Sequence, residues 1–190
     1  LGVKCEFQII DWDNKVLELN SKNIDAVWNG MTLTDEVKNS MRTTKAYLNN
    51  AQVVVLPTSL AKKYKTTDQM KKLSFAVESG SAGAKEAKAN GFKITEVTDQ
   101  ATALLEVSSG NQDAAVMDSL MAAAMVGPGT SYAKLTPTVK LNKEEYGVGF
   151  RKGSDLAPAL DALFAKMYKD GSLLKLAKKY GVQEALIDQK

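Results

Sequence analysis

Two stretches of 17 residues, DWDNKVLELNSKNIDAV at 11–27 and DQATALLEVSSGNQDAA at 99–115, share seven identical residues at a constant offset of 88 positions. Chance alone gives about one identity over such a length. The identical pairs are Asp11/Asp99, Leu17/Leu105, Glu18/Glu106, Ser21/Ser109, Asn23/Asn111, Asp25/Asp113 and Ala26/Ala114. The agreement indicates one supersecondary unit that the chain uses twice.

Each copy of the repeat predicts a strand, a helix and a second strand. An alternating or apolar run comes first, at 6–10 in one copy and 92–97 in the other. A helix-period segment and a polar turn follow, and a second apolar run ends the copy at 26–28 or 114–117. We therefore expect an α/β fold of two lobes, each a mainly parallel sheet flanked by helices.

The ends of the repeated strands are where we expect a binding site. Ligands of open parallel sheets lie beyond the carboxyl ends of the strands. Residues 29–32 in one lobe and 117–119 in the other follow such strands, so they are expected to face each other across a cleft.

Composition narrows the classes of function. The 190 residues are 44% hydrophobic and 25% charged, which is ordinary for a globular protein. The net charge of +3 comes from lysines scattered along helix faces, a pattern that argues against nucleic acid as a partner. With one cysteine and no histidine, the chain has no intrachain disulfide, no histidine base and no Cys/His zinc site. No run reaches the length of a membrane span, and we expect no metal, no cofactor and no catalytic residues.

The path between the lobes is predicted from its turn residues. Pro57 ends the apolar strand 53–56 and marks a change of lobe. A glycine-punctuated strand at 146–151 returns to the first lobe. The amphipathic helices 155–169 and 173–180, each followed by glycine, place their apolar stripes in the core.

Five ordered motifs carry a resemblance to a known family. They are DW…IDAVWNGMTLTDE, NAQVVV, VESGSAG, DAAVMD and EYGVGFRKGS…KDGSLLKLAKKYG. Together they resemble the extracytoplasmic solute-binding proteins of amino-acid ABC transporters, which have the type II periplasmic-binding fold. The resemblance covers essentially the whole chain.

The resemblance implies a fold, a partner and a location. It implies two lobes, at 1–56 plus 146–190 and at 58–141, with hinges near 56–58 and 142–145. Hinge closure would trap a small polar ligand, and the closed form would be presented to an ABC permease in the membrane. The protein would then be extracytoplasmic, either periplasmic or a surface-anchored lipoprotein, although no signal peptide is recognisable in this chain.

Four ligand-binding residues of the first lobe follow from the resemblance. Trp12 matches the aromatic residue that covers the ligand, and a large rigid ring suits that role. Asn29, Gly30 and Thr32 match the residues that hold the ligand's amino and carboxylate groups. A glycine there lets the ligand approach the backbone, and a hydroxyl both donates and accepts.

The second lobe supplies a glycine turn for the ligand's carboxylate. The resemblance places Ser79, Gly80, Ser81 and Ala82 in this turn. Backbone N–H groups at the start of the following helix, aided by its dipole, bind an anion there.

Two carboxylates complete the expected site. Asp118 matches the aspartate that pairs with the α-ammonium group, and Glu78 points inward from the end of its strand. The family's clamping arginine is replaced by Val37, and Lys38 offers only a point charge from another direction. With two carboxylates and no matched cation, we expect a cationic amino acid or an amine as ligand.

The family's opening strand, helix and strand lie upstream of Leu1 and are absent from the sequence. The first lobe should therefore lack the strand that separates 6–10 from 26–28. We expect the exposed edges to pair directly, to receive a separate N-terminal segment, or to exchange strands in a homodimer, which we favour.

Two other functions stay open. Some relatives with this fold are dehydratases of the cyclohexadienyl type, and Glu78 is the only obvious general acid. A non-binding remnant is the third possibility, because of Val37 and the missing opening segment. A solute-binding component of a transporter is the favoured function.

Overall fold

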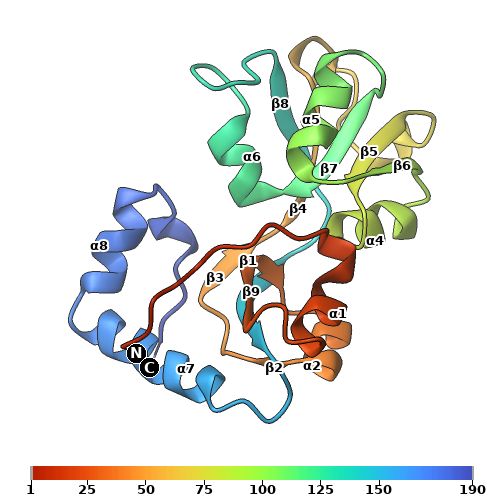
Figure 1. Ribbon diagram of the computed structural model, residues 1–190. Coiled ribbons are helices and arrows are strands. Elements are labelled where there is room, and N and C mark those ends of the chain that lie inside the picture. The colour runs from red at the N-terminus through yellow and green to blue at the C-terminus, as the bar shows by residue number, and fades with distance from the viewer. Residues whose placement is uncertain (1, 190) are drawn as a thin grey trace. The chain divides into compact units, whose positions relative to one another are not determined.

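The computed structural model describes residues 2–189 (Figure 1). It divides into two compact units. Unit 1 contains residues 2–10, 14–50 and 144–189, and unit 2 contains residues 11–13 and 51–143. Each unit has its own sheet, and the two are described one at a time.

Unit 2 is built on a five-stranded sheet. Its strands run in the spatial order β6-β5-β7-β4-β8. They are β4 (Gln52–Pro57), β5 (Ser74–Glu78), β6 (Lys93–Val97), β7 (Ala114–Asp118) and β8 (Leu135–Lys140). β5 pairs in parallel with β6 and β7, whereas β4 is antiparallel to β7 and β8.

Helices cover both faces of this sheet. They are α3 (Thr67–Met70), α4 (Ala82–Ala89), α5 (Gln100–Ser108) and α6 (Ser119–Met125), with the 3-10 turn η2 (Thr58–Leu60). A further 3-10 turn, η1 (Trp12–Asn14), comes earlier in the chain, directly before residue 15. Successive residues of a strand point to opposite faces. Val53 and Val55 accordingly join one core cluster with Leu104 of α5, and Val54 joins a second with Ala87 of α4. A continuous apolar run such as QVVVL is therefore expected in β4.

Unit 1 holds a smaller, wholly antiparallel sheet. Its strands are β1 (Ala26–Thr32), β2 (Arg42–Thr43), β3 (Leu48–Asn50) and β9 (Glu144–Phe150), and the first three all pair with β9. The helices are α1 (Lys15–Asn20), α2 (Asp35–Ser40), α7 (Leu156–Lys169) and α8 (Ser172–Lys179), followed by the 3-10 turn η3 (Gln183–Ala185).

The core of unit 1 forms where α7 and α8 pack on β9. Val148 and Phe150 of β9 contact the apolar stripe of α7, including Leu160 and Phe164. Gly149 lies between them, and a Cβ there would collide with the Met41 and Met31 side chains. The two C-terminal helices and their apolar stripes are as the sequence predicted.

Much of the predicted organisation is confirmed, including the two-lobed α/β fold and the strand, helix and strand of the second repeat copy. One expected strand is wrong: residues 2–10 form neither helix nor strand. Phe7 and Ile9 are fully exposed there, at 99% and 101%. An extended segment becomes a strand only when its backbone groups find a ladder partner, and no other described segment pairs with it.

Two further expectations need correction, and strand pairing is again the reason. The sheet of unit 1 is antiparallel instead of mainly parallel, because β9, a returning strand, pairs with every other strand of that sheet. Residues 52–57, which we expected to end the first lobe, are β4 and hydrogen-bond on both sides within unit 2. The chain therefore changes unit between Asn50 and Ala51, earlier than expected, and returns between Lys143 and Glu144.

The core of unit 2 gives a matched test of packing. Leu104 is completely buried in α5, while its neighbour Leu105 is 54% exposed. We expect Leu104→Ala to lower the free energy of unfolding by about 2–5 kcal/mol, because it leaves a cavity. Leu105→Ala should change it by about 0.5 kcal/mol. Urea denaturation followed by circular dichroism measures both, and equal losses would contradict the assigned helix face.

Candidate functional site

The candidate site of unit 2 lies where the strand order reverses. From β5 the chain passes through α4 to β6 on one side, and from β6 through α5 to β7 on the other side of β5. In open α/β sheets a crevice forms at the carboxyl ends of the strands at such a reversal. Glu78 and Asp118 are the last residues of β5 and β7, so the topology brings both predicted carboxylates to this edge.

Asp118 is buried, with 8% of its surface exposed, and two glutamine side chains hold its carboxylate. Gln52 Nε2 donates to Oδ1 at 2.7 Å, and Gln100 Nε2 donates to Oδ2 at 2.5 Å. The Asp118 backbone N–H in turn donates to Gln100 Oε1 at 3.0 Å. Gln52 reaches the carboxylate because it lies directly opposite Asp118 in the β4–β7 ladder.

Glu78 belongs to the same network. Gln100 Nε2 also donates to Glu78 Oε2, at 3.3 Å, so one amide nitrogen lies between two carboxylates. Carboxylates in a partly buried place attract a cation and disfavour an anion. The arrangement is therefore suited to an ammonium group.

The glycine turn after β5 has the geometry that the sequence predicted for the start of a helix. Ser81 is the N-cap of α4, and its Oγ accepts the backbone N–H of Ala84 at 3.0 Å. Ala82 is the first residue of the helix, where backbone N–H groups lack an intrahelical acceptor. Ser79 Oγ donates instead to Glu96 at 3.4 Å, and the Lys88 ammonium group lowers the pKa of the Glu96 carboxyl.

Trp12 lies in η1, and this turn packs on the glycine turn. Gly80 has a φ of +64°, and a Cβ at this position would lie 2.7 Å from the Asp13 Cα. Residues 11–13 group with unit 2, so the sequence assignment of Trp12 to the first lobe needs correction. Trp12 itself is half-buried.

Three candidate residues lie on β1 in unit 1. Asn29 is exposed, and Gly30, with a φ of +57°, lies in the irregular part of the β1–β9 ladder. A Cβ on Gly30 would lie 3.3 Å from the Tyr146 hydroxyl. Thr32 Oγ1 donates to Glu144 Oε1 at 2.9 Å, and Asn50 Nδ2 donates to the same oxygen at 2.6 Å.

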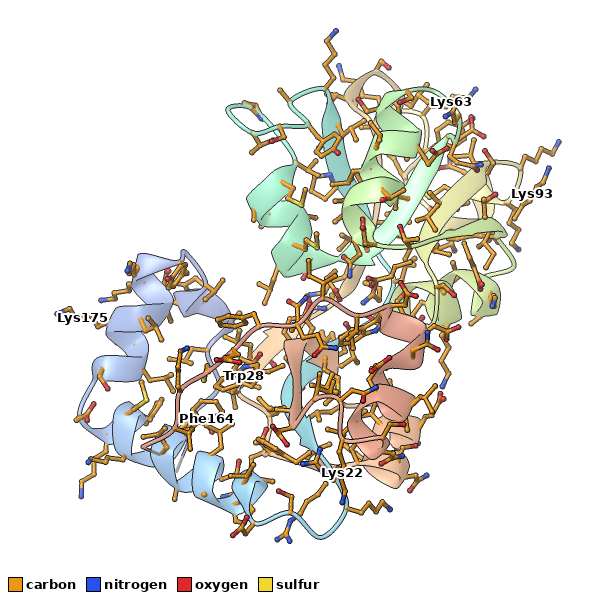
Figure 2. All side chains as sticks on the ribbon, in the orientation of Figure 1. Lys22, Trp28, Lys63, Lys93, Phe164 and Lys175 are labelled. Carbon is orange, nitrogen blue, oxygen red and sulfur yellow. The ribbon has the colours of Figure 1, made fainter. Side chains whose placement is uncertain are left out.

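Trp28, the residue before Asn29, belongs to an aromatic cluster in unit 1. Figure 2 shows Trp28 beside Phe164, and their ring centroids are 5.9 Å apart in an edge-on arrangement. Tyr47 lies 5.5 Å from the same ring. Burial raises the pKa of the Tyr47 hydroxyl, and a hydrogen bond with the Trp28 side chain partly offsets that rise.

Val37 takes no part in polar binding. It lies in α2 and is buried, with 6% exposed, while Thr34 caps the helix through its Oγ. Lys38 next to it is exposed. The position of the expected arginine is therefore a core position in unit 1, and Val37 supplies no group that could clamp a carboxylate.

Sequence reasoning missed three polar residues that hold the candidate side chains in place: Gln52, Gln100 and Glu144. The repeat contained a signal for one of them, because the offset of 88 residues aligns Gln100 with Trp12. Gln52 and Glu144 gave no such signal. Their importance comes from strand pairing, which places Gln52 opposite Asp118 and Glu144 opposite Asn50.

The fold and these polar strand ends define an α/β solute-binding class, and comparison with known proteins identifies the family. The profile of the bacterial extracellular solute-binding proteins, family 3, matches residues 1–183. The chain belongs to this family. In the part of the chain that the structure describes, no helix is both long and apolar enough to span a membrane.

Individual relatives agree with this membership. The L-cystine-binding protein TcyJ of Escherichia coli (strain K12) is 28% identical over 95% of this chain and 68% of its own length. An ancestral arginine-binding protein, solved with arginine bound, is 30% identical with a TM-score of 0.84, over 94% of this chain and 81% of that one. An ancestral amino-acid-binding protein described as a precursor of cyclohexadienyl dehydratase is 31% identical with a TM-score of 0.84, over 94% and 78%.

The contact between η1 and the glycine turn is testable with a matched glycine. Gly91 also has a positive φ, of +70°, but a Cβ there meets nothing within 4 Å. Gly91→Ala should cost about 1–2 kcal/mol of stability from the backbone conformation alone. Gly80→Ala should cost on the order of 1–3 kcal/mol more, because it also displaces Asp13. Equal losses in thermal unfolding would contradict the contact.

Proposed function

We propose that this protein is the substrate-binding component of an ABC transporter and that its ligand is an amino acid, with a cationic one preferred. The observation that carries the proposal is the pair of carboxylates, Glu78 and Asp118, at the sheet edge of unit 2. An ammonium group offers three N–H donors to such a pair. The names of the arginine- and cystine-binding relatives support an amino acid as the ligand.

We propose that each candidate residue of unit 2 contacts a different part of the amino acid. Asp118 would accept the α-ammonium group. The backbone around Ser79, Ser81 and Ala82 at the start of α4 would receive the α-carboxylate, helped by the helix dipole. Glu78 would face a second cationic group, and Trp12 would cover the aliphatic part of the ligand.

Unit 1 would contribute a smaller polar set. We propose that Asn29, the Gly30 backbone and Thr32 also contact the ligand, since they follow one another on β1 and Thr32 is held by Glu144. With Val37 in place of a guanidinium group, these residues give neutral hydrogen bonds. A ligand that engages both units would favour a closed form, as the hinge hypothesis requires.

The proposed setting is extracytoplasmic, with the loaded protein delivered to an ABC permease. Membership of the extracellular solute-binding family supports this location. Binding without catalysis is the proposed activity. Glu78, the one candidate general acid, accepts a hydrogen bond from Gln100 at 3.3 Å.

A ligand panel with a charge-matched control tests the function. Calorimetry should show that lysine, arginine or a polyamine binds and that glutamate does not. Asp118→Asn should weaken binding by about 2–5 kcal/mol, or roughly 30-fold and more, because the ligand's ammonium group loses the carboxylate that pairs with it. Asp68→Asn, which removes an equal charge from an exposed ion pair with Lys71, should leave affinity unchanged.

Four results would contradict the proposal. Tight binding of glutamate or aspartate would reject the preference for cations. An Asp118→Asn variant that binds like the parent would reject the role of that residue. Turnover of a prephenate-like acid, detected by product analysis, would instead assign the dehydratase function, and the absence of any ligand would favour a non-binding remnant.

We also propose that this chain forms a homodimer by adding a strand to the edge of unit 1. In the described residues β1 pairs only with β9, so its other edge is open. Residues 3–9 carry Val3, Phe7 and Ile9 in alternation, exposed at 68%, 99% and 101%. An extended segment with alternating apolar residues can hydrogen-bond to an open strand edge. A second copy of the chain has the same segment and the same edge, so each copy can add a strand to the other.

Sedimentation of the chain at micromolar concentration tests this assembly. We expect a dimer, and the double substitution Phe7→Glu with Ile9→Glu should dissociate it, because charges replace the apolar face of the added strand. Exchanging Leu105, an exposed leucine of unit 2, for glutamate should leave the dimer intact. A stable monomer would refute the dimer, and mass spectrometry would then show whether a separate N-terminal segment occupies the edge.

A further inference from the structure

Gln100 has every polar group of its side chain engaged at the candidate site. It is the first residue of α5, directly after the N-cap Asp99, whose carboxylate accepts the Thr102 N–H at 2.6 Å. The two Nε2 hydrogens point to Glu78 and Asp118, and Oε1 accepts the Asp118 backbone N–H. The helix start thus fixes the backbone of a residue whose amide contacts two strand ends.

The orientation of this amide is determined by chemistry. A backbone N–H requires an oxygen opposite it, and two carboxylates require a donor. The reverse orientation would place Oε1 against two anionic groups and Nε2 against the Asp118 N–H. Only one of the two orientations satisfies all three neighbours, so the amide has a fixed direction.

We propose that Gln100 is a positioning residue for cation recognition: its amide holds the Glu78 and Asp118 carboxylates side by side, so that both act on one ammonium-bearing ligand. This inference rests on the proposed function and extends it to a residue that makes its contribution through two others. It places the preference for cations in the pair of carboxylates, not in Asp118 alone.

The physical reason is the repulsion between the two carboxylates. Both carboxylates approach the same Gln100 nitrogen, and two carboxylates that share one site disfavour joint ionisation. An N–H donated to each carboxylate stabilises the ionised form of both. Without the amide, Asp118 would keep the Gln52 hydrogen bond at Oδ1 and lose the Gln100 hydrogen bond at Oδ2.

The elements around the pair carry charged groups of both signs. β4, β7 and α6 carry no titratable side chain other than Asp118. The adjacent elements carry further charged groups: Lys93 and Glu96 of β6, Lys85, Glu86 and Lys88 of α4, Asp13 of η1, Asp99, and Glu106 at the far end of α5. Glu96 pairs with Lys88 at 2.7 Å. The Gln100 amide donates to both Glu78 and Asp118.

The test compares Gln100→Met with Gln112→Met. Methionine keeps the length and the helix propensity of glutamine but removes the amide. Gln112 lies in the same unit, and its Nε2 donates to Thr95 Oγ1. This contact involves neither Glu78 nor Asp118, so Gln112 serves as the control. We expect Gln100→Met to weaken binding of lysine or arginine about tenfold or more at pH 7, and further at pH 5.

A second measurement does not depend on any ligand. Carbon-detected NMR follows the Asp118 carboxyl in the unliganded protein, and in Gln100→Met its titration should move to higher pH than in the parent and in Gln112→Met. Equal affinities at both pH values, or an unmoved titration, would overturn the proposal.

The two measurements also separate this proposal from the proposed function. If the parent binds no amino acid or amine, the proposed function is wrong, and the titration alone decides whether Gln100 sets the charge of Asp118. If the parent binds but Gln100→Met binds equally well with an unmoved titration, the function stands and the positioning role is rejected. Thermal unfolding of each variant confirms that the comparison is made on folded protein.

Discussion

A buried carboxylate must be hydrogen-bonded, and the site in unit 2 depends on how Asp118 meets that requirement. Gln52 of β4 and Gln100, the first residue of α5, donate to its carboxylate, and the Asp118 backbone N–H at the end of β7 donates to Gln100. They meet because the strand order reverses at β5 and because β4 runs antiparallel beside β7. The topology of the sheet thus creates the polar network, and the network holds the Glu78 and Asp118 carboxylates at the ends of β5 and β7.

The helix packing of unit 2 supports the same edge. Gly83 in the first turn of α4 has no side chain, and a Cβ there would lie 2.8 Å from Gln52 Oε1 and 3.1 Å from the Val116 carbonyl. The helix start can therefore lie close against β4 and β7. The glycine turn and the carboxylate pair are parts of one packed region, held by the two apolar clusters on either face of the sheet.

Unit 1 is held together by different contacts. Its sheet is organised around β9, with Arg151 just after the strand donating to the carbonyls of Leu19 and Ile24 and to Asp25. This arrangement ties the α1–β1 turn to the returning strand. Val37 is a core residue there, so the position at which we expected an arginine contributes packing in unit 1 and no charge.

The sequence by itself determined the elements of the second repeat copy, the two C-terminal helices and the family, because apolar periodicity, caps and ordered motifs are local signals. It also placed Glu78 and Asp118 at strand ends. The tertiary structure decided what local signals cannot: that 6–10 has no partner strand, that β4 belongs to unit 2, and that Trp12 packs with the glycine turn. It revealed the roles of Gln52 and Gln100, because their contacts with Asp118 cross 66 and 18 residues of chain and arise only when β4 pairs with β7 and α5 packs on the sheet.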